Sequence, residues 1–255
     1  MAAELIIAES TDSTNTAVKQ LFDTLEDGSC FCALEQRAGR GRLGRKWITP
    51  PGTALCFSAV FKNVSEAYHA GAIVALAALD MLKNHLPDLP VFFKWPNDLY
   101  VGQNKLSGIL SEGVISHGKL AGVISGIGIN LNQSKEELAQ LDNPATSLFA
   151  ESGRSFAIPP LCRELFERIQ ELYAEYHCEP AAVIARWQKA NALIGHTLEV
   201  IRPDGSRMTG IFSGIAPDGA MLLEINGTEE RFDCGDVKID PASLPNFTAP
   251  ADQNR

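Results

Sequence analysis

Glycine and positive charge alternate in one short part of the chain, residues 36–47, which read QRAGRGRLGRKW and are called here the Gly–Arg segment. Ten of its residues hold five positive charges, at Arg37, Arg40, Arg42, Arg45 and Lys46. Glycine lets the backbone approach a ligand closely, and the forked donors of arginine match the oxygens of carboxylates and phosphates. A solvated basic loop is the alternative, but the regular alternation favours an anion site. The segment is not a Walker loop, because no Gly-Lys-Ser/Thr closes it.

Asn97 and Asp98 follow Pro96 between two apolar runs, and this pair has two interpretations. Carboxylate and amide oxygens at a strand end suit Mg²⁺, which takes a few hard oxygens and shares the rest of its shell with phosphate and water. On these residues alone, an Asx turn is the more ordinary interpretation. Lys105, which precedes the apolar run 106–110, is either a solvated strand end, as its spacing favours, or a cation directed at a bound anion.

Residues 9–16 (ESTDSTNT) carry five hydroxyl side chains and Asn15 at an expected strand-to-helix junction. Such a junction offers free N–H groups and hydroxyl donors to a polar ligand, and N-capping accounts for only one or two of these residues. Farther along, Gly126 and Gly128 alternate with apolar residues, without the GxGxxG pattern of a dinucleotide-binding fold. We expect these glycines to make room for a flat or bulky ligand beside the sheet, with Asn130 at the end of the strand.

The elements that must position these residues are predicted from apolar periodicity. Strands are expected at 4–8, 30–35, 54–61, 91–94, 98–101, 105–114 and 120–130. Helices are expected at 14–26, 65–86, 134–141, 160–177 and 180–190, and a polar loop at 36–51. After Gly195, turn dipeptides separate about five short strands. The predicted fold class is α+β, a mixed central sheet flanked by helices and followed by a small antiparallel β unit.

Composition and charge exclude several classes of protein. The start of the chain has no basic region typical of a signal peptide, and the longest apolar run, Ala70–Leu79, is far too short to span a membrane. Six cysteines without a CxxC pair indicate reduced thiols in a cytoplasmic protein, and the five histidines show no metal-ligand spacing. A net charge of −9 opposes nucleic-acid binding, which needs a basic face.

Six short motifs, in this order, resemble those of the biotin–protein ligases, also called biotin–[acetyl-CoA-carboxylase] ligases. They are DSTN at 12–15, GRGRLGRKW at 39–47, KWPNDLY at 94–100, KLSGIL at 105–110, GIGIN at 126–130 and ATSL at 145–148. The resemblance covers nearly the whole chain. It implies a class II synthetase-like catalytic domain over residues 1–192, a small SH3-like β-barrel over 193–240 and a flexible tail over 241–255.

The implied reaction has two steps and uses biotin and ATP as substrates with Mg²⁺. Biotin and ATP give biotinyl-5′-AMP and pyrophosphate, and a lysine of a biotin carboxyl carrier protein or domain then attacks the acyl carbon. A carboxylate must be converted into a mixed anhydride before an amine can attack it. Bringing that carboxylate to a triphosphate places like charges in contact, which fixed cations and Mg²⁺ offset.

The resemblance also implies roles for single residues. The ureido head of biotin is expected to be bound by Ser13, Thr14, Asn15 and Gln36, with Arg40 and Gly41 in a loop that closes over it. Arg42 and Lys105 meet the biotin carboxylate and the adenylate phosphate, and Gly108 lies beside biotin. Arg45 and Lys94 face the triphosphate, and Asp98 holds Mg²⁺. ATP or the adenylate is also bound by Trp47, Asn97, Asn130 and Ala145. Arg42, Arg45, Asp98 and Lys105 are therefore the expected catalytic residues.

Three rival functions follow from the same residues. A lipoate–protein ligase or octanoyltransferase has a related fold, a non-catalytic module would only retain biotin or nucleotide, and a regulator would bind nucleic acid. Some members of the resembled family carry an N-terminal helix-turn-helix and repress biotin-synthesis genes. This chain starts at the catalytic domain, so no repressor activity is expected. Monomers and homodimers through the central sheet both occur in that family.

Overall fold

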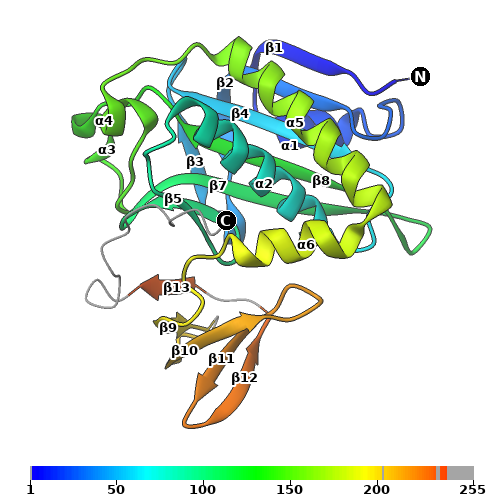
Figure 1. Ribbon diagram of the computed structural model, residues 1–255. Helices are drawn as coiled ribbons and strands as arrows, with labels where there is room; N and C mark the ends of the chain where they lie inside the picture. The colour runs from blue at the N-terminus through cyan, green and yellow to red at the C-terminus, as the bar shows by residue number, and fades with distance from the viewer. Residues whose placement is uncertain (1, 203, 234–235, 240–255) are drawn as a thin grey trace, which may run out of the picture.

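The computed structural model describes residues 2–202, 204–233 and 236–239, and its centre is a mixed eight-stranded sheet (Figure 1). Its strands are β1 (Leu5–Thr11), β2 (Cys30–Arg40), β3 (Lys46–Thr49), β4 (Ala54–Phe61), β5 (Val91–Lys94), β6 (Asp98–Val101), β7 (Asn104–Ser116) and β8 (Lys119–Asn130). They lie in the order β1-β2-β4-β8-β7-β6-β5, with β3 paired to β2. Only β1 and β2 run parallel to each other; the other pairs are antiparallel. Every residue of β4 is buried, as expected of a strand covered on both faces.

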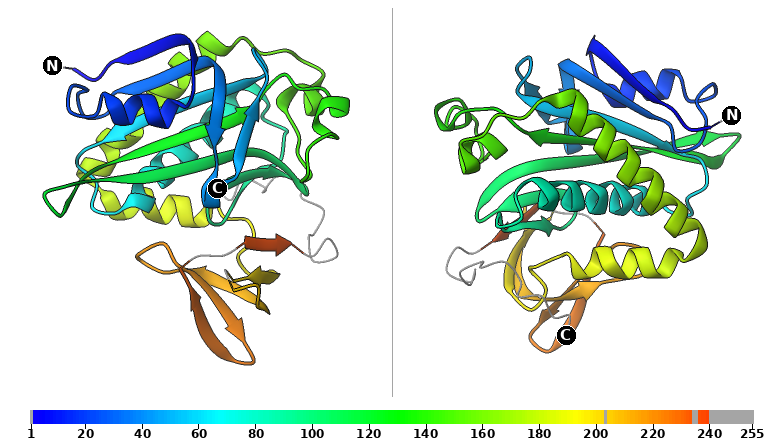
Figure 2. Two further views of the ribbon diagram at one scale, coloured as in Figure 1. Left: turned by 180° about the vertical axis from the view of Figure 1, so that it is seen from behind. Right: turned by 45° about the horizontal axis from the view of Figure 1, so that its top comes forward.

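Helices cover both faces of this sheet. The longest are α2 (Ala67–His85) and α5 (Ile158–Cys178), which pack on each other and, with α6 (Pro180–Lys189), cover one face (Figure 1). Helix α1 (Thr14–Gln20) lies on the other face, as the view from behind shows (Figure 2). Alternation along β2 separates the two cores, because Cys30 and Cys32 join the α2–α5 side while Phe31 and Ala33 join the α1 side. Two short helices, α3 (Lys135–Leu138) and α4 (Leu148–Ser152), follow β8.

The prediction of a polar loop at 36–51 is wrong, because most of this segment belongs to two paired strands. Strand β2 continues to Arg40, a 3₁₀ turn (η1, Arg42–Gly44) follows, and β3 returns beside β2 with Gly39 opposite Trp47. Backbone pairing between two distant halves of the segment therefore overrides its polar composition. The helix expected at 14–26 is also shorter, since it ends at Gln20.

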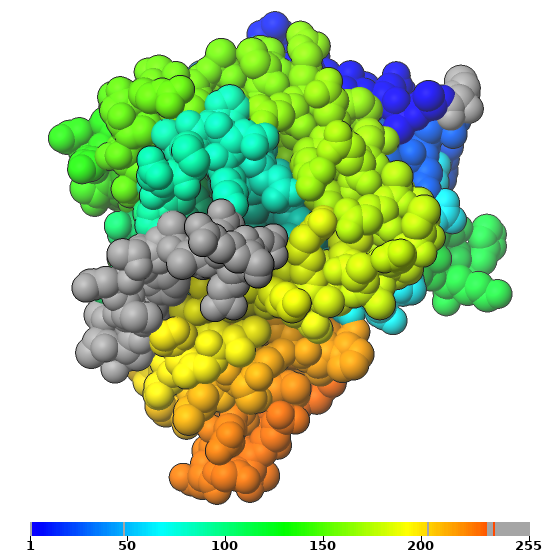
Figure 3. Space-filling view, viewed as in Figure 1, coloured from blue at the N-terminus to red at the C-terminus, as the bar shows by residue number. Residues whose placement is uncertain are grey.

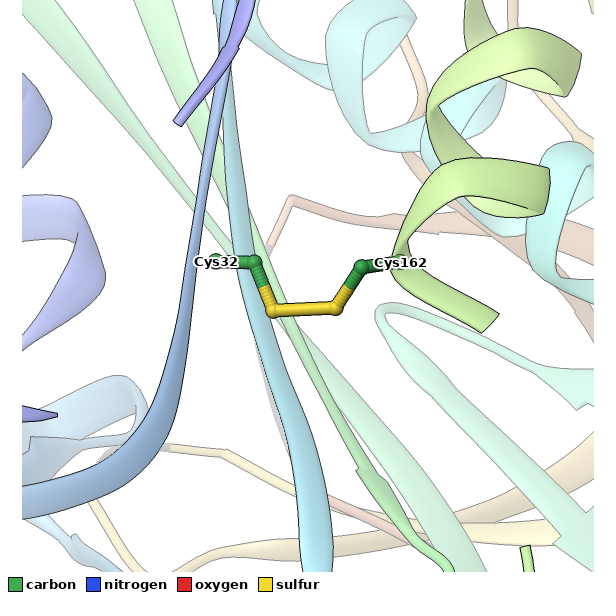
Figure 4. The surroundings of a disulfide bond; sticks show 2 residues. All are labelled: Cys32 and Cys162. Carbon is green, nitrogen blue, oxygen red and sulfur yellow. A yellow bond between two sulfur atoms is a disulfide. The ribbon is translucent and has the colours of Figure 1, made fainter. Parts of the chain in front are cut away.

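The cysteines differ in part from the expectation of reduced thiols. Cys32 of β2 and Cys162 of α5 are both fully buried and form a disulfide, with their Cα atoms 6.6 Å apart (Figure 4). The sequence separates them by 130 residues, so only the packing of α5 on the sheet brings them together. Cys30 and Cys56 are buried free thiols, and burial raises the pKa of both, to about 11 for Cys56. These two are neutral core residues, as expected, whereas Cys234 lies outside the described residues.

A second sheet follows Gly195 within the described residues. It contains β9 (Thr197–Ile201), β10 (Arg207–Ile215), β11 (Met221–Ile225), β12 (Thr228–Phe232) and β13 (Asp236–Ile239), in the order β12-β11-β10-β9-β13. All of its pairs are antiparallel, so the predicted small β unit is confirmed. The expected tail at 241–255 lies outside the described residues.

The turn between β10 and β11 docks the small sheet onto the large domain, and Figure 3 shows the two in contact. The Trp95 indole N–H donates to the Gly219 carbonyl at 2.9 Å, and the Tyr68 hydroxyl donates to the Pro217 carbonyl. His69 lies behind Tyr68, with its Nε2 2.7 Å from the Tyr68 hydroxyl. Burial raises the pKa of Tyr68 to about 12 and lowers the pKa of His69, which keeps both groups neutral at pH 7. The two parts are thus held by hydrogen bonds between uncharged partners.

Among the residues that the structure describes, no helix has both the length and the apolar character needed to cross a membrane.

A pair of glycine substitutions tests the docking turn. Gly219 and Gly227 both have positive φ, but a Cβ on Gly219 would lie 2.7 Å from the Tyr68 ring, whereas one on Gly227 would meet nothing within 4 Å. Gly227→Ala should cost about 1 kcal/mol of folding free energy through φ alone. Gly219→Ala should cost about 1–3 kcal/mol more through the clash. Urea unfolding followed by circular dichroism measures both, and equal losses would contradict this docking geometry.

Candidate active site

A cavity of about 680 Å³, a size usual for small-ligand sites, opens beside β7 and β8. It is enclosed by the start of α1, the Gly–Arg segment, the β5–β6 turn, residues 141–145 and two residues of the small sheet, Ile201 and Val237. Every site residue assigned from the sequence lines it: Ser13, Thr14, Asn15, Gln36, Arg40, Gly41, Arg42, Arg45, Trp47, Lys94, Asn97, Asp98, Lys105, Gly108, Asn130 and Ala145. Residues from distant parts of the sequence therefore meet at one place.

One corner of the cavity consists of buried, uncharged polar groups. The backbone N–H of Thr14, in the first turn of α1, donates to Gln36 Oε1 at 2.9 Å, so a β2 side chain satisfies a helix-end donor. Ser58 Oγ of β4 lies 2.7 Å from both Thr14 Oγ1 and Asn15 Oδ1. Thr14, Asn15, Gln36 and Ser58 are all buried. Such a corner can hold a neutral polar group by hydrogen bonds, and we call it the polar corner.

The opposite wall carries charge at the β5–β6 turn. Asp98 begins β6 and lies opposite Gly108 of β7, and its Oδ1 is 2.7 Å from Lys105 Nζ. Arg42 donates to Asn97 Oδ1 at 3.0 Å, and Asn97 Nδ2 donates to the Ile109 carbonyl at 2.7 Å. The strands expected at 91–94 and 98–101 are confirmed, and the turn between them and the start of β6 carry the side chains that hold both cations in place.

A third wall is formed by the segment after β8. The backbone of Lys105 pairs with this segment on both sides of Ala145, accepting from Thr146 N–H at 2.9 Å and donating to the Pro144 carbonyl at 3.1 Å. Asn130 donates to the Thr146 carbonyl at 3.0 Å and accepts from Gln133 at 3.1 Å. Asn130 therefore positions the segment that carries Ala145, beside the backbone of Lys105.

Gly126 and Gly128 both line the cavity, which agrees with the expectation that they make room beside the sheet, but the atoms nearest to them belong to the protein. A Cβ on Gly126 would lie 2.1 Å from Asn15 Oδ1, and one on Gly128 would lie 2.4 Å from the Trp47 indole. The two glycines thus let Asn15 and Trp47 lie close to β8, and all four residues line the cavity. Trp47 Nε1 lies against Gly128, where it is buried and has no hydrogen-bond partner among the described residues.

The cavity is positively charged although the chain is acidic. Six cationic side chains line it: Arg40, Arg42, Arg45, Lys46, Lys94 and Lys105. Asp98 and Asp142 are the acidic residues among the described residues that line it. The described residues contain no group of three or more His, Cys, Asp or Glu that could hold a metal ion. The geometry suits an anionic ligand with a neutral polar end.

Several residues that line the cavity or contact its lining residues were not expected from the sequence. Ser58 is a polar residue in an otherwise apolar strand, which is a signal that could have been found. Glu112 contacts both Asn15 and Arg40, and Tyr100 accepts from Lys94 at 3.2 Å, but neither stands out locally. Ile201 and Val237 reach the cavity only because the small sheet docks where it does.

Comparison with known proteins supports one family. The Biotin/lipoate A/B protein ligase family matches residues 7–130. A biotin–[acetyl-CoA-carboxylase] ligase of Mycobacterium tuberculosis is 31% identical over 92% of this chain and 88% of its own length. The enzyme of that name from Paracoccus denitrificans is 30% identical over 84% of this chain and 91% of its own length. The solved biotin protein ligase of Aquifex aeolicus, in complex with biotin and ATP, superposes with a TM-score of 0.76 at 25% identity, covering 92% of this chain and 97% of that one.

A ligand-free measurement tests the position of Trp47. Gly128→Ala should expel the indole from the sheet and move tryptophan emission to longer wavelength, because indole emits at lower energy in water. Gly214→Ala, where an added Cβ meets nothing within 4 Å, is the matched control and should leave the emission unchanged. The shift should vanish when Gly128→Ala is made in a Trp47→Phe background. A shift that persists there would place its origin at Trp95 or Trp187 instead.

Proposed function

Because this chain belongs to the family of biotin–protein ligases, we propose that it uses ATP to join biotin to a lysine of a carboxylase carrier protein. The observation that carries the proposal is the cavity itself. It places a neutral polar corner and six cations around one space, as a substrate with a ureido head and a carboxylate that must meet a triphosphate requires.

The reaction has two steps. A biotin carboxylate oxygen attacks the α-phosphorus of ATP, an O–P bond forms, and the bond to pyrophosphate breaks. The lysine amine of the carrier then attacks the acyl carbon of biotinyl-5′-AMP, and the acyl–oxygen bond breaks as AMP leaves. Both steps gather negative charge on phosphate oxygens, so both are accelerated by cations held in place beforehand.

The polar corner is proposed to bind the biotin head. Ser13, Thr14, Asn15 and Gln36 come from the start of α1 and from β2, and they offer amide and hydroxyl groups to a ureido ring. Arg40 and Gly41 begin the turn that covers this corner, and Gly108 lies on the β7 wall beside Lys105. Lys105 is then placed to meet the carboxylate of a biotin whose head occupies the corner.

The charged wall is proposed to bind ATP and the adenylate. Arg42 and Lys105 neutralise the carboxylate and the α-phosphate, while Arg45 and Lys94 face the outer phosphates. Asn97 orients Arg42 through its 3.0 Å hydrogen bond. The segment positioned by Asn130, with Ala145 and Trp47 nearby, is proposed to enclose the adenine.

Mg²⁺ is proposed to be held by Asp98. A single carboxylate does not suit a resident metal but fits Mg²⁺, which takes one or two carboxylates and completes its shell with phosphates and water. The ion would neutralise charge on the phosphates as the leaving group departs. Asp98 also holds Lys105, at 2.7 Å, so this carboxylate fixes the cation on which both steps depend.

The wider setting belongs to the same proposal. Residues 1–192 form the catalytic unit and 193–240 the small barrel, and the reaction occurs in the cytoplasm, where ATP is supplied. The net charge of −9 supports a function without nucleic acid.

Substrate-dependent exchange separates biotin from lipoate, since the matched family comprises ligases for both. We expect the purified protein to exchange pyrophosphate into ATP when biotin and Mg²⁺ are present, and not with lipoate or octanoate. Lipoate-dependent exchange would move the protein to the rival function. The absence of exchange with any of these acids would reduce the site to a binding scaffold.

Removal of single cations tests the assigned roles. Lys105→Ala and Arg42→Ala should each lower biotin-dependent exchange by about a hundredfold or more, because each deletes a preorganised charge at the reacting phosphate. Lys119→Ala, on the exposed turn of the β7–β8 hairpin, is the control and should retain exchange. Circular dichroism checks that each variant folds. Near-normal exchange in both site variants would overturn these assignments.

A further inference from the structure

Glu112 lies where the polar corner meets the Gly–Arg segment, and we propose that it is a positioning residue for both. It contacts Asn15 and Arg40 but is not among the residues that line the cavity. It would therefore act through its neighbours, holding Asn15 in the orientation that receives the substrate and tying Arg40 over it. This inference rests on the proposed function.

The first contact fixes the orientation of an amide. Asn15 Nδ2 donates to Glu112 Oε2 at 2.7 Å and to the Leu110 carbonyl at 3.1 Å. An ionised carboxylate only accepts hydrogen bonds, so it determines that the NH₂ end of Asn15 faces β7. Oδ1 then faces Ser58, 2.7 Å away. Asn15 is buried and packs against Gly126, where even an added methyl would collide with it, so the amide has little freedom to relocate.

The effect continues through the polar corner. Asn15 Oδ1 accepts the Ser58 hydroxyl proton, Ser58 Oγ lies 2.7 Å from Thr14 Oγ1, and Thr14 contacts Gln36 Oε1 through both its N–H and its hydroxyl. These four side chains are buried, so a change in the orientation of one of them alters the hydrogen bonds of its neighbours. One carboxylate at the end of this chain of hydrogen bonds therefore sets the directions of the donors and acceptors offered to a ligand.

The second contact reaches the Gly–Arg segment. The Arg40 guanidinium lies 3.0 Å from the same Glu112 Oε2, and it also donates to Thr16 Oγ1 at 3.4 Å. Arg40 is the last residue of β2, and only Gly41 separates it from the turn at Arg42–Gly44. Most exposed ion pairs contribute little because both long side chains must be ordered. Here the Glu112 side chain is only 28% exposed and is already ordered by Asn15, so Arg40 meets a prepared partner.

Glu112→Gln is the direct test. Glutamine keeps the size but removes the charge, and its amide can present either end to Asn15. We expect the KM for biotin to rise about ten- to hundredfold, the range of a hydrogen bond to a charged group, while the KM for ATP and kcat of exchange change less than threefold. Arg40→Gln alone and in combination completes a double-mutant cycle. The combined effect should be smaller than the product of the single effects, because the two residues act through one contact.

A matched control removes the same kind of group elsewhere. Asp80 of α2 pairs with Arg168 of α5 at 2.6 Å, and both side chains are about one-third exposed. Asp80→Asn should change unfolding as much as Glu112→Gln does, yet leave the KM for biotin within twofold. A KM for biotin unchanged in Glu112→Gln, or shifted equally in Asp80→Asn, would overturn the positioning role.

A second measurement needs no catalysis. Trypsin should cut the Gly–Arg segment after Arg42 and Arg45 faster in Glu112→Gln than in the unaltered protein or in Asp80→Asn, because Arg40 is no longer tied to β7. Equal rates of cutting would contradict the second contact. An unaltered protein without biotin-dependent exchange rejects the proposed function and, with it, this role. An active one with an unchanged Glu112→Gln variant rejects the positioning role alone.

Discussion

Six cationic side chains face one cavity, and their mutual repulsion is the constraint that the surrounding structure must satisfy. Like charges at about 4 Å repel by about 1–4 kcal/mol, depending on the local dielectric. Hydrogen-bond and ion-pair acceptors on β6, on β7 and in the β5–β6 turn offset part of this repulsion. Asp98 holds Lys105, Glu112 holds Arg40, and Asn97 accepts from Arg42. Strand pairing holds Asp98 against β7 and Glu112 against β8, and Asn97 is bonded to the Ile109 carbonyl, so these acceptors keep the three cations in position. The cations are thus in place before an anionic ligand arrives.

The cations can surround one cavity because the start of α1 and the Gly–Arg segment pack closely against β7 and β8. Strands β7 and β8 carry glycines where Asn15 and Trp47 press against the sheet, so these side chains lie nearer the backbone than any Cβ would permit. The Gly–Arg segment can therefore continue as strand β2, turn at the cavity and return as β3 beside β2. The same contact buries the Trp47 indole N–H without a hydrogen-bond partner among the described residues. The packing of the Gly–Arg segment on the sheet therefore brings both its cations and the Trp47 ring to the cavity.

The small sheet is connected to this site by its docking turn. Trp95 follows Lys94 at the end of β5, and its indole is bonded to the Gly219 carbonyl. The β5–β6 turn that carries Asn97 and Asp98 is thus held from the main sheet on one side and from the small sheet on the other. Any displacement of the small sheet would reach these two side chains through Trp95. The small sheet also contributes Ile201 and Val237 to the cavity, so it completes a wall of the site.

The sequence by itself determined the family, the strands at 54–61, 91–94 and 98–101, and many of the residues that line the cavity, because these follow from local motifs and local periodicity. Only the tertiary structure decided the course of the Gly–Arg segment, since strand pairing between its two halves overrides its polar composition. It also paired Cys32 with Cys162, assigned the space beside Gly126 and Gly128 to the protein's own side chains, and brought Ser58 and Glu112 to the site. Each of these depends on contacts between residues far apart in the chain, whose distances and directions exist only once the sheet has formed.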